Sequence, residues 1–184
     1  MPFVLGDLAY RFGWYKGGQT NHGELISPPV AVADLSLTDA SQKKVEAGFT
    51  QRTWWLVYVL PEVCDQACKN RLYQMRQVDA ALGKEAGRVQ QLIVQTAPLS
   101  AETEQLIARE FAQFTRVHGQ VDRIDQALKR VDATAVKSGS LYIMDPMGWI
   151  MMRYQAENDE AKSVVEAEDI LNDMKKLLKS SRIG

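Results

Sequence analysis

The 184-residue sequence has very few residues with thiol or imidazole side chains: two cysteines and two histidines. Two cysteines cannot hold together a small disulfide-stapled protein, so the fold must rest on an apolar core. Hydrophobic residues make up 46% of the chain, which suffices for such a core and excludes a mostly disordered protein. The length fits one domain, alone or with an extension.

The sequence also lacks an excess of charge of either sign. The 22 lysines and arginines nearly balance 23 acids, for a net charge of −1. Binding to nucleic acid in general requires a basic excess that neutralises phosphates, so we expect no nucleic-acid partner. No run of 18 or more apolar residues occurs, so no segment of the sequence as given is expected to span a membrane.

Motifs of nucleotide-binding and hydrolytic enzymes are absent as well. The sequence contains no phosphate-binding glycine loop, no G-x-G-x-x-G fingerprint, no G-x-S-x-G elbow and no H-E-x-x-H zinc motif. Asp122, Asp125 and Asp132 are spaced as on a solvated helix face, so we expect them to be exposed and not to form a hydrolytic pair. Nothing in the sequence indicates a nucleotide-dependent enzyme.

Residues 1–32 are predicted to form an N-terminal extension. Residues 11–18 (RFGWYKGG) combine aromatic, basic and glycine residues, as is typical of the water side of a membrane span. We therefore expect the end of a membrane anchor whose upstream part is missing from this chain; the alternative is a mildly apolar, frayed terminus. Pro28 and Pro29 disfavour a helix and predict an extended lead-in over residues 19–34.

From residue 33 onward, segments with strand and helix patterns alternate. The continuous aromatic and β-branched run at 53–60 is typical of a strand buried on both faces. Asp145-Pro146-Met147-Gly148 suits a tight turn and predicts a hairpin. The expected strands are 33–37, 53–60, 88–95, 140–144 and 149–154; the expected helices are 64–82, 102–116 and 159–180, with a short helix or irregular crossover at 122–131.

This order predicts one α/β domain over residues 33–184. A strand, a crossover helix and a second strand give a parallel pair with a right-handed connection. The closing hairpin adds an antiparallel pair, and the last helix covers a face. The expected fold is thioredoxin-like, with a mixed four-stranded central sheet and helices on both faces.

Cys64 and Cys68 lie at the start of the first predicted helix, directly after the first buried strand. A helix N-terminus carries partial positive charge that favours thiolate. Residues four apart share a helix face, so the two thiols could form a disulfide after a small adjustment, or hold a soft ion such as Cu(I). The alternative is two inert cysteines packed in the core.

Charges beside the cysteines act in both directions. Glu62 and Asp65 would raise the pKa of Cys64, whereas Lys69 and Arg71 on the following turn partly offset them. Other metal ligands are weaker candidates: His118 is predicted to be a solvated turn residue that could swing toward the thiols, and His22 to be exposed. Met144, Met147, Met151 and Met152 could offer thioethers to Cu(I), although Met144 and Met152 are expected to pack in the core because they lie in predicted strands.

The sequence resembles the Sco/SenC family over roughly residues 33–180. The resemblance rests on the strand WWLVYVL (54–60), the CxxxC pair that follows it, and the distant hairpin segment YIMDPMG (142–148). The opening segment ADLSLTD (33–39) is similar to the first hairpin of the family. CxxxC alone is a weak pattern, and the combination with the hairpin is what makes the resemblance specific.

The resemblance implies a membrane-anchored, thioredoxin-like protein that helps to assemble the copper centre of cytochrome c oxidase. It makes Cys64 and Cys68 the catalytic, or copper-binding, cysteines. It implies a client such as an oxidase subunit or a thiol–disulfide partner, and a location at the bacterial inner membrane on the periplasmic side. That space is oxidising, so a cysteine pair can cycle there.

One position departs from the family pattern. Where the family has a histidine as third copper ligand, eight residues before the aspartate of the hairpin turn, this sequence has Lys137. A protonated amine is no copper ligand at neutral pH. The leading hypothesis is therefore a thiol–disulfide oxidoreductase for oxidase assembly in which Cys64 attacks and Cys68 resolves. The alternatives are a non-enzymatic Cu(I) carrier and a redox-inactive adaptor of the same fold.

Overall fold

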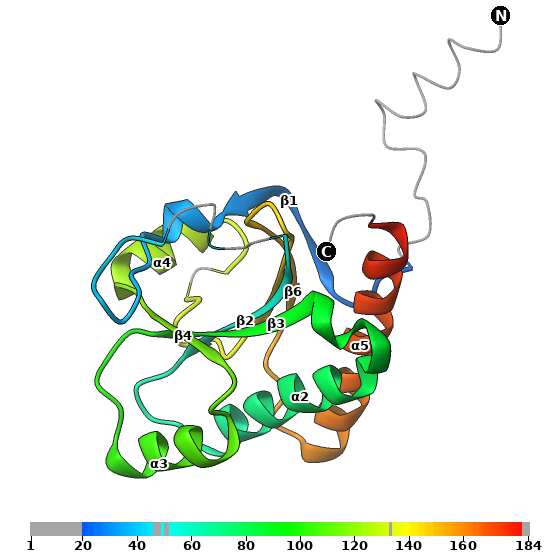
Figure 1. Ribbon diagram of the computed structural model, residues 1–184. Coiled ribbons are helices and arrows are strands. Elements are labelled where there is room, and N and C mark those ends of the chain that lie inside the picture. The colour runs from blue at the N-terminus through cyan, green and yellow to red at the C-terminus, as the bar shows by residue number, and fades with distance from the viewer. Residues whose placement is uncertain (1–19, 46–48, 50–51, 133, 182–184) are drawn as a thin grey trace, which may run out of the picture.

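The computed structural model of the chain describes residues 20–45, 49, 52–132 and 134–181. Within them, one six-stranded mixed sheet has the strand order β1-β6-β5-β2-β3-β4, with helices on both faces (Figure 1). The predicted mixed sheet with helices on both faces is confirmed, but its predicted strand count of four is wrong. The candidate anchor residues 11–18 lie outside the described residues.

The elements run along the chain with short connections between most of them. None of the helices in the described part of the chain is long and apolar enough to cross a membrane. The helices and strands, in chain order, are β1 (Glu24–Ala31), the 3-10 helix η1 (Val32–Leu35), β2 (Trp54–Leu60), α2 (Gln66–Leu82), the 3-10 helix η3 (Gly83–Arg88), β3 (Val89–Gln95), α3 (Ala101–Glu110), β4 (Thr115–His118), α4 (Val121–Leu128), β5 (Leu141–Met144), β6 (Trp149–Tyr154) and α5 (Glu160–Ser180).

β2 is a central strand, parallel to β3 and antiparallel to β5, and all of its residues are buried. Its side chains alternate between two apolar clusters, as the period of a strand requires. Leu56 and Tyr58 belong to the cluster that α2, α3 and α5 cover, whereas Val57 and Val59 belong to the cluster that η1 and α4 cover. The prediction of a strand buried on both faces is confirmed.

Strand β1 is the first addition to the predicted sheet. It pairs antiparallel with β6, although it lies within the segment predicted as an N-terminal extension. Its sequence includes Pro28 and Pro29, and proline is not found in central strands because it has no backbone N–H to donate. An edge strand tolerates proline because one row of its backbone groups has no strand to bond. The pairing register also shifts between Leu25 and Val30, on either side of the prolines.

Strand β4 is the second addition, and it shortens a predicted helix. Helix α3 ends at Glu110 and not at residue 116, and β4 then pairs parallel with β3. Phe111 and Phe114 are spaced as on a helix face, yet both are buried from the turn that follows α3. A strand of four residues between two turns has too little pattern to compete with that spacing. The predicted strand at 33–37 is likewise replaced by η1.

The topology brings two segments to one edge of the sheet. α2 begins soon after the end of β2 and packs along α5. Because β5 is antiparallel to β2, with Leu141 opposite Tyr58, the segment before β5 lies near the end of β2. The residues after β2 and the residues before β5 therefore meet at the edge where the cysteines lie.

Candidate functional site

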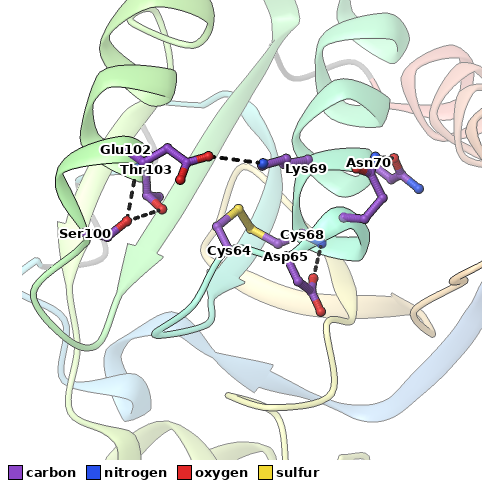
Figure 2. Close-up of a disulfide and its surroundings, with 9 residues drawn as sticks. Cys64, Asp65, Cys68, Lys69, Asn70, Ser100, Glu102 and Thr103 are labelled. Atoms are coloured by element: carbon purple, nitrogen blue, oxygen red, sulfur yellow. Dashed lines mark hydrogen bonds and ion pairs between the residues drawn. A yellow bond between two sulfur atoms is a disulfide. The ribbon is translucent and has the colours of Figure 1, made fainter.

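The two predicted cysteines are joined in a disulfide, with their Cα atoms 5.1 Å apart (Figure 2). Cys64 lies in the loop after β2, and Cys68 lies in the first turn of α2. Between them, Asp65 is the N-cap of the helix, and its Oδ1 accepts the N–H of Cys68 at 3.0 Å. The helix thus begins after Cys64, and the freedom of the loop supplies the adjustment that the bridge requires.

The two sulfur-bearing residues differ in their exposure. Cys68 is 1% exposed, whereas Cys64 is partly exposed and follows two exposed residues, Glu62 and Val63. Cys64 is therefore the cysteine that an external thiolate can approach more readily, while Cys68 belongs to the apolar core. This asymmetry is what a pair with one attacking and one resolving sulfur requires.

One side of the disulfide is bordered by the start of α3 (Figure 2). Ser100 is the N-cap of this helix, and its Oγ accepts the N–H of Thr103 at 3.2 Å. Lys69 on α2 forms an ion pair with Glu102 at 3.5 Å. Both side chains are exposed enough that this ion pair adds little stability. The pair does place the carboxylate of Glu102 beside the Lys69 ammonium, which was expected to favour the thiolate form of Cys64.

The other side of the disulfide opens onto a cavity of about 350 Å³ that Cys68 lines. Residues 137–139, which precede β5, line the same cavity. Lys137 therefore lies in the cavity of the cysteine pair, where the family resemblance requires a histidine. Lys137 is an exposed residue and lines the same cavity as Cys68.

Tyr58 on β2 also lines this cavity. Burial raises the pKa of its phenol far above its ordinary value, against an opposing effect of the Arg71 charge, while Asp65 adds to the rise. The phenol is therefore protonated at any physiological pH. Tyr58 is available as a hydrogen-bond donor but not as a base.

Arg71 is a buried residue of this site that we predicted only as a charge near the cysteines. Its guanidinium is 3% exposed and forms an ion pair with Glu166 of α5 at 2.7 Å. It also donates to the backbone oxygens of Gly139 at 3.2 Å and Gln155 at 2.7 Å, and to Gln74 Oε1 at 2.6 Å. The sequence held one signal of this burial: Arg71 is a basic residue on the apolar side of the predicted helix, immediately before Leu72.

Asp132 contradicts the expectation of a solvated helix face, because it lies beyond the end of α4 and is 6% exposed. Its Oδ2 accepts the hydroxyls of Ser138 at 2.6 Å, Ser140 at 2.9 Å and Tyr142 at 2.9 Å. Burial would raise the pKa of this carboxyl, but these hydrogen bonds and the charge of Arg153 hold it below its ordinary value. Asp132 is therefore ionised and bound behind residues 137–139.

The other candidate metal ligands are not brought to the cavity. His118 lies on β4, bonded through its backbone to Thr38, and His22 is exposed and pairs with Asp169 at 2.9 Å. Met144 and Met152 pack in the core as predicted. Among the described residues, no three or more His, Cys, Asp or Glu side chains are arranged to hold a metal ion.

The donor set does not fit a three-ligand copper site of the kind that the resemblance implies. The two sulfurs are bonded to each other, so they become thiolate ligands only after reduction. The third position is occupied by Lys137, whose ammonium has no lone pair to offer.

Residues 54–181 match a family model described as transmembrane-like, thioredoxin-like, C-terminal domain. No curated protein sequence matches the chain. Similar solved structures include BsSco, a Sco family member described with a disulfide switch (16% identity, 84% of this chain and 96% of that chain, TM-score 0.57). A second is yeast Sco1 with copper bound (17% identity, 89% of this chain and 96% of that chain, TM-score 0.56). A third is a thiol:disulfide interchange protein from Bacteroides sp. (15% identity, 87% of this chain and 91% of that chain, TM-score 0.54).

Sequence identities this low establish the fold and nothing finer. The predicted thioredoxin-like fold is confirmed, and structures of Sco family proteins and of thioredoxin-like oxidoreductases share it with this chain.

Proposed function

Because the chain belongs to the family of transmembrane-like, thioredoxin-like C-terminal domains, we propose that it is a thiol–disulfide exchange protein that acts through Cys64 and Cys68. One observation carries the proposal. The pair joins a partly exposed cysteine in a loop to a buried cysteine at a helix N-terminus, and the buried cysteine lines an open cavity. A disulfide that served only as a staple would have no need of that asymmetry.

The exchange proceeds in two steps. A client thiolate attacks Cys64 Sγ, the bond between Cys64 and Cys68 breaks, and Cys68 leaves as a thiolate while a mixed disulfide forms. A second client thiolate then attacks the client sulfur and releases Cys64. The client dithiol becomes a disulfide, the protein pair becomes a dithiol, and the two protons of the client pass to the released thiolates. In the opposite direction, reduced Cys64 attacks a client disulfide and Cys68 resolves the intermediate.

The surroundings of Cys68 suit it as the leaving group. It lies in the first turn of α2, where unpaired amides and the helix dipole favour negative charge. The carboxylate of Asp65 opposes that effect, because it already accepts the N–H of Cys68. The buried guanidinium of Arg71 lies one turn further along the same helix face and adds a fixed positive charge on that side.

The client and the location follow from the resemblance to Sco proteins. We propose a client of the respiratory oxidase assembly pathway, and a place on the periplasmic side of a bacterial inner membrane, reached through an N-terminal anchor. Copper handling at Cys64 and Cys68 stays a prediction. The proposed exchange involves only the cysteine thiols, because the donor set supplies two thiolates only after reduction and a lysine at the third position.

Exchange with a small aromatic disulfide tests the proposal. The chain has two cysteines, so the double variant Cys64→Ser/Cys68→Ser is a thiol-free control. We expect the reduced wild type to release two equivalents of aromatic thiol per cysteine pair, as one aromatic disulfide is reduced and the Cys64–Cys68 disulfide re-forms, and the double variant to release none. A reduced wild type that releases no product would leave a Cu(I) carrier, if it binds Cu(I) under anaerobic titration, or an adaptor, if it does not.

A further inference from the structure

We propose that Arg71 and Asp132 are positioning residues for the exchange reaction, and that together they hold residues 137–139 opposite the disulfide. The inference rests on the proposed function, because it concerns residues 137–139, the part of the cavity wall that lies in the same cavity as Cys68. The structure shows no contact between either residue and the sulfur atoms. Each therefore acts through residues 137–139, which we call the wall.

Arg71 holds the wall from the side of the cysteines. It lies three residues after Cys68, on the same face of α2. Its Nε donates to the backbone oxygen of Gly139 at 3.2 Å, and its Nη2 donates to that of Gln155 at 2.7 Å. Both acceptors belong to segments that line the cavity, since Gly139 and residues 156–158 are among its lining residues. One rigid, planar group therefore links the cysteine helix to two other parts of the cavity wall.

The position of this guanidinium is itself fixed by α2 and α5. Its Nη1 donates to Gln74 Oε1 at 2.6 Å and to Glu166 Oε2 at 2.7 Å. Gln74 in turn donates to the backbone oxygen of Ser163 at 2.6 Å and to its hydroxyl at 2.8 Å. A buried charge with this many partners has little freedom to move, and loss of any partner leaves a buried polar group unsatisfied.

Asp132 holds the same wall from behind. Its Oδ2 accepts the hydroxyls of Ser138 and Ser140, the residues on either side of Gly139, and also that of Tyr142 at the start of β5. Ser138 Oγ additionally accepts the N–H of Ser140 at 3.2 Å. The backbone on both sides of Gly139 is thereby attached to one buried carboxylate.

The backbone of the wall leaves little room for an alternative position. Gly139 has a φ of +66°, a conformation that glycine adopts at low cost. A Cβ at this position would lie 3.0 Å from Cβ of Ala156, which also lines the cavity. The two wall segments therefore approach each other closely, and the two anchors define the space between them and the disulfide.

We infer that a client polypeptide bound at Cys64 extends over the cavity that Cys68 and residues 137–139 line, whereas a small disulfide needs only the sulfur. A displacement of about 1 Å in a positioning element can cost a rate factor of about 100. Loosening either anchor should therefore slow exchange with a polypeptide much more than exchange with a small molecule.

The structure supplies a matched control for Asp132. Asp173 is also a buried carboxylate that accepts a tyrosine hydroxyl, that of Tyr154 at 2.8 Å. Its other partners include the N–H groups of His22 and Gly23, and it is not one of the residues that line the cavity. Asp132→Asn and Asp173→Asn thus remove comparable buried charges, one behind the wall and one away from it.

The test compares two second-order exchange rate constants for each full-length, reduced variant. One substrate is a small aromatic disulfide, and the other is the disulfide-linked dimer of a short unstructured peptide. We expect the ratio of peptide rate to small-disulfide rate to fall at least tenfold in Asp132→Asn and to stay within twofold of wild type in Asp173→Asn. Arg71→Lys, which keeps the charge but loses the planar fork, should behave as Asp132→Asn does.

An unchanged ratio in Asp132→Asn, or an equal fall in both aspartate variants, would overturn the proposal and leave Asp132 a structural residue. If Asp132→Asn does not fold, Ser138→Ala removes one hydrogen bond to the carboxylate and must lower the same ratio. A wild type inactive toward both substrates would instead refute the proposed function itself, so the two failures are distinguishable.

Discussion

We expect that replacing Cys64 by serine abolishes exchange, and that replacing Cys68 by serine produces a protein that attacks a disulfide once and then remains bound to the client. Cys64 is the accessible sulfur, and Cys68, 1% exposed, is the sulfur that resolves the intermediate. Without Cys64 no external disulfide can be reached, so we expect turnover to fall by about 10³-fold or more. Without Cys68 the mixed disulfide accumulates.

Intact-mass measurement of the two single variants after incubation with the disulfide-linked peptide dimer checks this assignment. Cys68→Ser should gain the mass of one peptide through Cys64, and Cys64→Ser should gain none. Alkylation of the reduced wild type provides a control, because Cys64 should react first. Trapping through Cys68 in place of Cys64 would reverse the roles and contradict the reading of their exposure.

Replacing Asp173 by alanine should lower the free energy of unfolding by about 3 kcal/mol, because it leaves several buried donors without an acceptor at about 1–3 kcal/mol each. Asp173 is 1% exposed. Its Oδ2 accepts the N–H groups of His22 at 2.8 Å and Gly23 at 3.0 Å, together with the hydroxyl of Tyr154. These bonds attach the start of the described chain to α5 and to the end of β6.

The same carboxyl makes stability depend on pH. Burial would raise its pKa, but the hydrogen bonds from Gly23, Tyr154, Lys176 and His22 hold that pKa below its ordinary value. A pKa that is lower in the folded than in the unfolded state gives stability that is fully present above the unfolded value of about 4 and is lost as the pH falls through the folded value. The pKa of Asp132 is also lowered in the folded state, so its contribution to stability is likewise lost as the pH falls.

Urea unfolding of wild type and Asp173→Ala at pH 7 and pH 3 measures both effects. The difference between the two proteins should be largest at pH 7 and should shrink at pH 3. Asp169→Ala is the matched control, one turn earlier on α5, since Asp169 makes a surface pair with His22 that should be worth less than about 1 kcal/mol. Equal losses in both variants would show that the buried network contributes nothing beyond a surface pair.

The elements that the sequence predicts well are those with a strong local pattern. The run at 53–60 has no polar interruption after its first residue, and it becomes β2, with both faces buried. β1 and β4 could not be predicted in the same way. The prolines of β1 are compatible with a strand only at a sheet edge, and β4 has a single fully buried residue, Val117.

The same limit applies to the candidate site. Cys64 and Cys68 were identifiable because they lie four residues apart in the sequence, directly after a run that predicts a buried strand. Arg71 was not identifiable as an anchor, because its partner Glu166 is 95 residues away along the chain. Asp132 could not be identified from a local pattern either, because its hydroxyl donors Ser138, Ser140 and Tyr142 reach one carboxylate only through the turn at Gly139, which has a φ of +66°.

The midpoint potential of the Cys64–Cys68 couple tests most directly whether this disulfide is a working redox pair. Equilibration with defined glutathione or dithiothreitol buffers, followed by alkylation and mass measurement, gives the value. A thiol–disulfide exchange protein should have a potential between about −120 and −270 mV, the range of known oxidoreductases of this kind. A potential below about −300 mV, typical of structural disulfides, would contradict the account.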